Sequence, residues 1–292
     1  MIEDRSWGSR LFDILNYTFL AIVALVCLLP LINVFAVSLS DRASTTAHLV
    51  KFWPVNFTTL NYEQIVDQAE FQGAFMISLI RVGLGSTLTV LVTILTAYPL
   101  SLTQGFSGQR LFKRLLIFAM LFSGGLIPWF LAIKSLGLLN TIWALILPMA
   151  VQVFYIIVML NFFRNLPVEL SEAATIDGAS HWDILFRIYI PLSKPALATI
   201  LLFVAVLYWN SWFDALILMN TSEQYPLQTY LKATVITLDF TRLLNDPLLV
   251  AKLSEQSLRA AQVFLATVPI LIVYPFLQRY FVKGLVLGSV KG

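Results

Sequence analysis

Six long runs of apolar residues alternate with shorter polar segments along the chain. None of these runs contains Asp, Glu, Lys or Arg, and they cover residues 14–40, 82–109, 115–133, 135–163, 195–213 and 260–278. A helix needs about 20 mainly apolar residues to cross a bilayer. The pattern therefore predicts an all-α membrane protein with six transmembrane helices. The first run is longer than the roughly 7–15 apolar residues of a cleaved signal, so we expect it to be retained.

The polar segments between the runs suggest an orientation. We expect a cytoplasmic tail at residues 1–13, followed by a single six-helix domain at 14–292. With the N-terminus inside, six crossings leave both termini in the cytoplasm. Most of the 19 Lys and Arg residues then lie on the inner side, including Arg110, Lys113 and Arg114 in one short loop, as the positive-inside rule requires. Two longer segments, about 41–73 and 220–258, become external loops, in which we expect short surface helices.

One polar segment, residues 166–192, is predicted to fold as a helical hairpin on the inner side. Pro167 suits the first turn of a helix, where its missing N–H is not needed. Good helix formers surround Ala173 and Ala174. The dipeptide Asp177–Gly178 is predicted to end this helix, because glycine is the usual residue where the backbone becomes left-handed.

The second helix of the hairpin has its own start and stop signals. Ser180 is predicted to cap it, with Asp183 three residues later in a short capping box. Pro191 and Pro195 are expected to stop it and to lead into the fifth apolar run. An apolar stripe at helical spacing consists of Trp182, Leu185, Phe186 and Tyr189. From these signals alone, a linker that lies on the lipid surface remains an alternative.

Composition supports the membrane class and excludes several kinds of site. Hydrophobic residues make up 59% of the chain and charged residues 12%, with a mean hydropathy of +0.82, whereas soluble domains carry about 25% charged residues. We attribute the net charge of +3 to cytoplasmic Lys and Arg and expect no nucleic-acid partner. Cys27 is the only cysteine, which rules out an internal disulfide. His48 and His181 are far apart in sequence, so we expect no metal site.

The order of residues in the hairpin resembles a known family. Glu172–Ala173–Ala174 is followed by three residues, Gly178, nine residues and then Ile188–Tyr–Ile–Pro191. This order resembles the coupling loop of the permease subunits of binding-protein-dependent ATP-binding-cassette (ABC) importers. The resemblance extends over essentially the whole chain. It is strongest in the second half, where Asp177–Gly178–Ala179, residues 191–195, residues 209–214 and residues 278–285 are also similar to the branch that imports di- and oligosaccharides.

The resemblance implies a type I permease fold and a role for each residue of the loop. In this family the hairpin docks into a groove on a separate ATPase and transmits its closure. By this resemblance, Glu172 anchors the loop by charge, Ala173 and Ala174 allow close approach, and Gly178 makes the turn. The other positions that match the coupling motif are Asp177, Ala179, Ile188 and Pro191.

The resemblance also implies partners and a location in the bacterial cytoplasmic (inner) membrane. The expected partners are a second, related permease subunit in a heterodimer, an ABC ATPase dimer, an external solute-binding protein, a saccharide substrate and membrane lipid. Within the branch, the chain is most similar in character to subunits that import acidic oligosaccharides such as alginate. By this resemblance it corresponds to the smaller permease subunit of an alginate importer.

The chain lacks the sequence signature of a phosphate-binding loop. No Gly–Lys dipeptide occurs, although a P-loop requires one to hold phosphates. We therefore expect no catalytic residues and no cofactor in this chain, and ATP and Mg to be bound by the partner ATPase. Six helices are few for a transport pathway with two halves, so a second permease is needed. Close contact at that interface could be made by small residues, either Gly83, Gly85 and Ser86 or residues 124–125. The alternative is that these glycines have no special role, since membrane spans commonly tolerate glycine.

The expected substrate pathway rests on a short cluster at the end of the fifth run. Trp209, Asn210, Trp212 and Asp214 offer aromatic faces and hydrogen-bonding groups, which together suit a sugar. An aromatic belt followed by a helix-ending Asp is the alternative. Arg81, at the start of the second run, is expected to reach the outer interface with its long side chain.

Two other functions compete with saccharide import. An importer of the same family could carry a peptide or a polyamine instead of a sugar. A stand-alone secondary transporter is a less favoured interpretation, because a proton-coupled carrier places carboxylates or histidines in mid-span, and the apolar runs contain none. That interpretation also leaves the hairpin unexplained.

Overall fold

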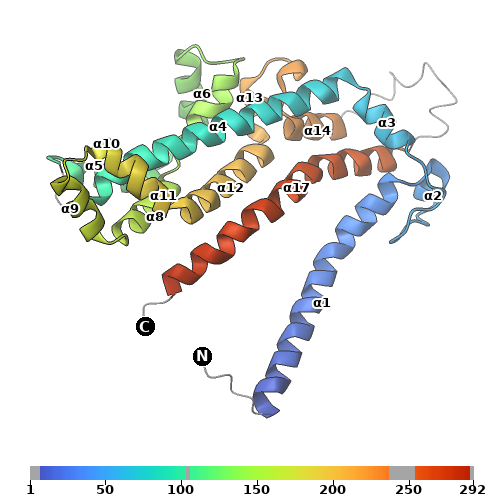
Figure 1. Ribbon diagram of the computed structural model, residues 1–292. Helices are drawn as coiled ribbons and strands as arrows, with labels where there is room; N and C mark the ends of the chain where they lie inside the picture. Colours follow the sequence, from blue (N-terminus) through green and yellow to red (C-terminus); the bar gives the residue numbers. More distant parts are fainter. Residues whose placement is uncertain (1–6, 103–105, 237–253, 290–292) are drawn as a thin grey trace. The chain divides into compact units, whose positions relative to one another are not determined.

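Helices are the dominant secondary structure of the described residues. The computed structural model describes residues 7–102, 106–236 and 254–289, with side chains to residue 233 in the second range and to 275 in the third. Within these ranges the one extended pairing is an isolated β-bridge between Ser40 and Phe57. The prediction of an all-α protein is confirmed (Figure 1).

Three helices are long and apolar enough to cross a membrane by themselves. They are α1 (Trp7–Ser38), α4 (Ala69–Ser101) and the first part of α17 (Glu255–Ser289). Helix α1 remains helical through Pro30, and α17 through Pro269 and Pro275.

Three further candidate spans each consist of two helices joined at a bend. The first pair is α5 (Gln109–Leu121) with α6 (Leu126–Ser135), bent by 117°. In the second pair, α7 (Ile142–Ile146) and η1 (Leu147–Met149) meet α8 (Val153–Arg164) at 48°. In the third, residues His181–Leu192 meet α12 (Lys194–Asn210) at 79°. The described residues therefore supply six spans if each bent pair counts as one.

Several predicted boundaries are wrong, for reasons that the structure explains. Helix α4 begins at Ala69 rather than at residue 82, because the charge of Arg81 is paired inside the protein and does not end the helix. The predicted inner loop 109–114 forms the first turns of α5. The third run is broken after Leu121, where Gly125 has a positive φ of 83°.

The first of two compact units comprises residues 1–69 and 233–268. Its core joins the end of α1 to the start of α17: Ala36 and Val37 pack with Val50 and Ala260. The rings of Phe35 and Phe264 are 4.6 Å apart.

Two short helices, α2 (Arg42–Thr46) and α3 (Leu60–Val66), lie in this unit and confirm the surface helices expected within residues 41–73. Asp41 caps α2, and hydrogen bonds from Ser44 hold the pKa of its carboxyl group below the ordinary value.

The second unit comprises residues 70–232 and 269–292 and contains the remaining helices. These are α9 (Val168–Ile176), α10 (His181–Ile184), the π-helical turn η2 (Leu185–Tyr189), α11 (Ile190–Leu192), α13 (Phe213–Leu218), η3 (Ser222–Gln224) and α14 (Leu227–Ile236). Helices η3 and α14 lie in the second expected external loop, of which residues 237–253 fall outside the described residues.

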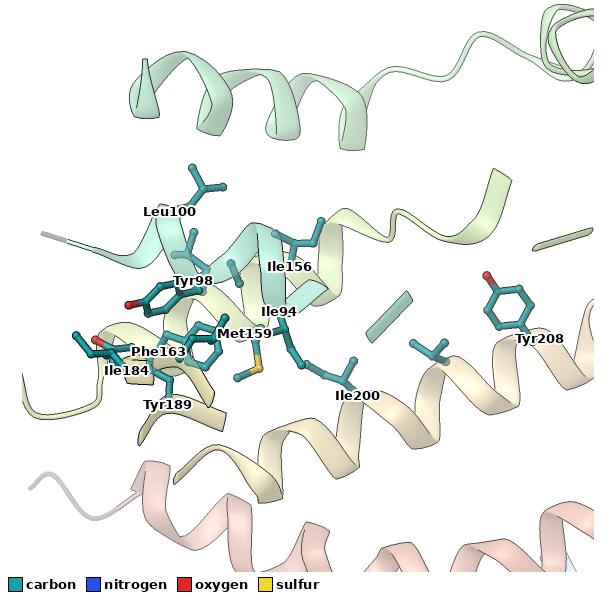
Figure 2. Close-up of a cluster of buried hydrophobic side chains, with 14 residues drawn as sticks. Ile94, Tyr98, Leu100, Ile156, Met159, Phe163, Ile184, Tyr189, Ile200 and Tyr208 are labelled. Atoms are coloured by element: carbon teal, nitrogen blue, oxygen red, sulfur yellow. The ribbon is translucent and has the colours of Figure 1, made fainter. Parts of the chain in front are cut away.

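The main core of this unit connects α4, α8, α12 and the hairpin (Figure 2). Tyr98, Phe163 and Tyr189 meet edge to face, with ring centroids 5.1–6.4 Å apart. A second cluster joins α6, α7 and α13 through Ile133, Leu145 and Leu218. The hairpin is therefore attached to the membrane helices by a continuous apolar core.

Candidate functional site

The turn of the hairpin has the geometry expected from its sequence. Helix α9 ends at Ile176, and Gly178 adopts a left-handed φ of 80°. The Gly178 N–H donates to the Thr175 carbonyl at 3.1 Å, and the Ala179 N–H donates to the Ala174 carbonyl at 2.9 Å. These two bonds form a Schellman motif, which satisfies the last carbonyls of the helix. The predicted glycine turn is confirmed.

The capping box that opens the second helix is also confirmed. The Asp183 N–H donates to Ser180 Oγ at 3.2 Å, and the Ser180 N–H donates to Asp183 Oδ2 at 3.3 Å. Arg187, one turn later, lies 3.4 Å from the Asp183 carboxylate. The turn is thus defined on both sides by local hydrogen bonds.

The helix ends between Pro191 and Pro195, as expected, but Pro191 itself lies inside it. The helix continues to Leu192, and the chain bends at Ser193. In the π-helical turn before Pro191, the Ile190 N–H donates to the Leu185 carbonyl, five residues back. We attribute the tolerance of proline to this wider turn, because a proline ring otherwise clashes with the carbonyl four residues before it. Pro195 lies in the first turn of α12, and Pro167 is the residue that precedes α9.

The candidate coupling residues divide between an anchored face and an exposed one. Ala174, Ala179 and Ile188 pack against the main core. The remaining members, Glu172, Ala173, Asp177, Gly178 and Pro191, are exposed.

The predicted apolar stripe divides in the same way. Leu185 and Tyr189 are buried, whereas Trp182 and Phe186 are 61% and 56% exposed and stack at 6.0 Å. The hairpin therefore presents a carboxylate, a small-residue turn and two aromatic rings on a firmly attached support.

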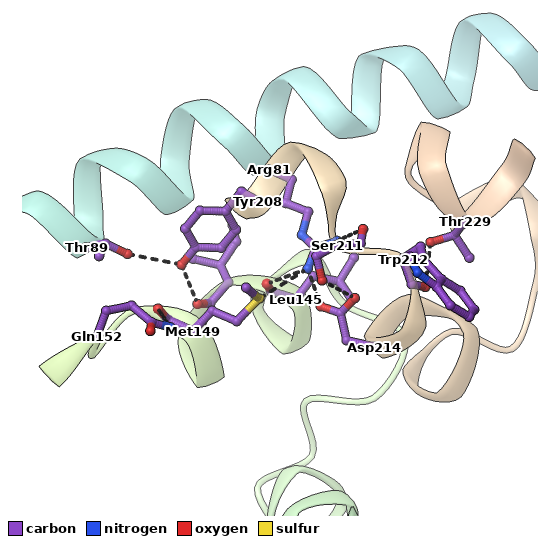
Figure 3. Close-up of polar contacts among 11 residues, drawn as sticks. Arg81, Thr89, Leu145, Met149, Gln152, Tyr208, Ser211, Trp212, Asp214 and Thr229 are labelled. Atoms are coloured by element: carbon purple, nitrogen blue, oxygen red, sulfur yellow. Dashed lines mark hydrogen bonds and ion pairs between the residues drawn. The ribbon is translucent and has the colours of Figure 1, made fainter. Parts of the chain in front are cut away.

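Arg81 occupies a different position from the one expected. It does not reach an interface: it is 0% exposed and forms an ion pair with Asp214 (Figure 3). Its guanidinium also donates to the carbonyl oxygens of Ser211 at 3.0 Å and Leu145 at 3.4 Å. The pair connects α4 with the two-residue break between α12 and α13.

The four candidate sugar-contact residues do not form one cluster. Trp209 is buried and meets Phe75 edge to face at 6.0 Å, Asn210 is exposed, and Asp214 is engaged by Arg81. Trp212 is 37% exposed, and the Lys232 ammonium lies 5.6 Å from its ring centroid. Trp212 therefore has a cationic neighbour that the sequence analysis missed, because Lys232 is twenty positions away.

Arg81 was also missed as a partner of Asp214, although one signal for the pair was available. The two residues are separated by 133 positions, so no local spacing connects them. They are, however, opposite charges at the ends of apolar runs, and charges in such segments tend to pair with one another. Among the described residues, no group of three or more His, Cys, Asp or Glu residues is arranged to hold a metal ion.

Comparison with curated proteins identifies relatives over nearly the full length of the chain. Protein LplC of Bacillus subtilis is 42% identical over 98% of this chain and 96% of the relative. The polygalacturonan/rhamnogalacturonan transport system permease protein YtcP of the same organism is 40% identical over 97% of this chain and 99% of the relative. The lactose transport system permease protein LacG of Rhizobium radiobacter is 30% identical over 97% of each.

Solved structures show the same relationship. A chain of a bacterial ABC transporter involved in the import of the acidic polysaccharide alginate is 35% identical, with a TM-score of 0.87 over 94% of this chain and 98% of that chain. A chain from the alginate transporter in complex with a pentasaccharide-bound periplasmic protein is 17% identical, with a TM-score of 0.55, and supports the fold alone.

A family model extends these similarities to one family of transport proteins. The model for the inner membrane component of binding-protein-dependent transport systems matches residues 3–286. The hairpin and the helical fold agree with this match. The chain belongs to the family of binding-protein-dependent transport system inner membrane components.

Proposed function

We propose that this protein is the membrane-spanning subunit of an ATP-driven importer that carries an acidic oligosaccharide into the cytoplasm. The observation that carries the proposal is the similarity to the alginate importer chain, at 35% identity and a TM-score of 0.87 over 94% of this chain. The polygalacturonan/rhamnogalacturonan permease YtcP supports the same substrate class, since polygalacturonan is also a polyuronate. Both termini lie in the cytoplasm, and the hairpin lies on the same side.

The chain acts together with other polypeptides. ATP and Mg are bound by a separate ATPase dimer, which receives the exposed face of the hairpin, and an external binding protein delivers the saccharide. A second, related permease completes the pathway. The chain itself catalyses no reaction, and its contribution is a shift between inward- and outward-facing states that ATP biases.

Uptake by the reconstituted complex tests the substrate class. We expect transport of radiolabelled uronate oligosaccharides and much weaker transport of neutral oligosaccharides of equal length. Uptake of a peptide or a polyamine, with no saccharide transported, would refute saccharide import and leave the family assignment intact.

Substituting Glu172 with lysine is expected to weaken association with the ATPase several-fold. Glu172 is exposed on α9, and an exposed charge pair contributes about 0.2–1 kcal/mol, while reversal adds repulsion. Co-purification of the membrane subunits with the ATPase measures the effect. Glu223→Lys, at an exposed position in η3, makes the same change in net charge and should not affect the yield. Equal yields from both variants would contradict the docking role.

Replacing Lys232 with glutamine is expected to lower uptake of acidic oligosaccharides several-fold and that of neutral ones little. The ammonium group beside the exposed Trp212 ring suits a sugar that carries a carboxylate. Trp212→Leu should lower uptake of both kinds, because ring stacking contributes about 0.5–1.5 kcal/mol whatever the charge of the sugar. Lys134→Gln, at an exposed lysine in α6, is the matched control. An equal loss for acidic and neutral sugars in Lys232→Gln would contradict a contact with the carboxylate.

A further inference from the structure

A completely buried arginine in a spanning helix requires a physical explanation. Arg81 is 0% exposed and lies within α4, one of the three helices long and apolar enough to cross a membrane alone. A charge in such a segment is costly unless it is paired and hydrogen-bonded. The groups that pair with Arg81 and accept its hydrogen bonds therefore indicate which segments this residue holds in place.

The groups around Arg81 come from two places outside its own helix (Figure 3). From the first turn of α13 comes the Asp214 carboxylate, and from the break between α12 and α13 comes, at 3.0 Å, the Ser211 carbonyl. From α7 and η1 come the Leu145 carbonyl at 3.4 Å and the Met149 sulfur at 3.5 Å. One guanidinium thus connects three segments of the second unit.

Arg81 donates a hydrogen bond to the segment in which one helix ends and the next begins. Helix α12 ends at Asn210 and α13 begins at Phe213. The last carbonyls of a helix lack partners within it, and in a membrane there is no water to replace them. Arg81 supplies the donor for Ser211. Asp214 lies in the first turn of α13, where a helix favours a negative charge, and it accepts a further hydrogen bond from Ser211 Oγ at 2.9 Å.

The break held in this way carries the exposed residues of the proposed pathway. Asn210 and Trp212 are the immediate neighbours of Ser211 and are both exposed. On its other side, Trp212 is held by Thr229 Oγ1, which donates to the Trp212 carbonyl at 2.8 Å. In Figure 3 the indole of Trp212 points away from the Arg81–Asp214 pair. The pair therefore fixes the backbone of this segment and leaves its side chains free to contact a substrate.

We propose that Arg81 and Asp214 are positioning residues for translocation, which hold the α12–α13 break so that Asn210 and Trp212 keep a fixed place in the pathway. This inference rests on the proposed import function. If the pair only stabilised the fold, replacing both residues with apolar ones of similar size would leave uptake unchanged, because such a replacement is often neutral for stability. The two roles can therefore be separated by removing both charges together.

The test compares three variants in the assembled importer. Arg81→Met/Asp214→Leu removes both charges and should still assemble, with a modest loss of melting temperature because the Ser211 and Leu145 carbonyls lose their donor. Its maximal uptake rate should fall about ten-fold, since small misplacements of contact groups are costly, while the KM for the loaded binding protein stays unchanged. Arg81→Lys keeps the charge but not the forked geometry and should be intermediate. Ser211→Ala removes only one hydrogen bond to Asp214 and should lower the rate a few-fold.

Each outcome decides the proposal. Parental uptake by the double variant would overturn it. If the double variant does not assemble, Ser211→Ala decides instead, and parental uptake by that variant overturns the proposal. Should the parental complex transport no saccharide, the proposed import function fails. The positioning role is then judged by the ATPase activity that the binding protein stimulates. Unchanged stimulation in Arg81→Lys and in the double variant would contradict the positioning role.

Discussion

A Gly178→Val substitution is expected to reduce ATP-coupled uptake about ten-fold or more while the chain still reaches the membrane. Gly178 has a φ of 80°, and a Cβ atom at this position would meet nothing within 4 Å. The cost is therefore backbone strain and not a clash. A left-handed conformation costs an ordinary residue about 1–2 kcal/mol, and a β-branched side chain is worse suited to it. The Schellman turn should open and change the angle between α9 and α10.

Uptake and ATPase activity of the reconstituted complex measure this effect together. Gly137→Val is the matched control, because Gly137 also has a positive φ, of 68°, and open space around it, but it lies in the turn after α6. Gly178→Asn should keep most of the activity, since asparagine tolerates the left-handed region. Coupled uptake at the parental rate in Gly178→Val would remove this turn from the mechanism.

The hairpin was predictable because its signals are local. The turn at Gly178 and the capping box of Ser180 with Asp183 each depend on residues within five positions of one another, and the structure contains both. The place of Pro191 inside the helix was less predictable, because the usual rule treats proline as a helix stop. A π-helical turn, which depends on the hydrogen-bond register of residues 185–189, was not visible in composition.

The ends of the spans were less predictable, because charges were taken as boundaries. Arg81 lies inside α4 because its charge is paired with Asp214, and this pair was missed because the two residues are 133 positions apart. Bends were missed for a related reason. The length of an apolar run does not show whether the helix bends. Residues 115–133 were therefore predicted as one span, although two helices meet there at 117° between Leu121 and Leu126.

The pathway residues show a further limit of reasoning from sequence. Trp209, Asn210, Trp212 and Asp214 are close in sequence, but they surround the end of a helix, where successive side chains point in different directions. As a result, Trp209 is buried, Trp212 is exposed and Asp214 pairs with Arg81. Closeness in sequence was therefore a poor guide to a common surface.

A Gly85→Ala substitution is expected to destabilise the protein by about 1–3 kcal/mol, the usual cost of overpacking a core. A Cβ atom at Gly85 would lie 2.6–2.8 Å from three ring carbons of Tyr208. This ring cannot move aside freely, because its hydroxyl group donates to the Ile146 carbonyl at 3.0 Å and lies 3.2 Å from Thr89 Oγ1. Gly85 was considered for contact with a second permease, but it instead allows α4 to approach Tyr208 of α12 within the same chain.

The melting temperature of the purified protein in detergent tests this contact, and the chain provides its own control. Gly83 lies two residues away in the same helix, and a Cβ atom there would meet nothing within 4 Å. Gly83→Ala should therefore be neutral or stabilising, since alanine is favoured over glycine in a helix by about 0.5–1 kcal/mol. Adding Tyr208→Leu to Gly85→Ala should recover part of the loss that the clash causes. Equal melting temperatures for Gly85→Ala and Gly83→Ala would mean that the Tyr208 ring moves without cost, and that α4 and α12 are not held together at this contact.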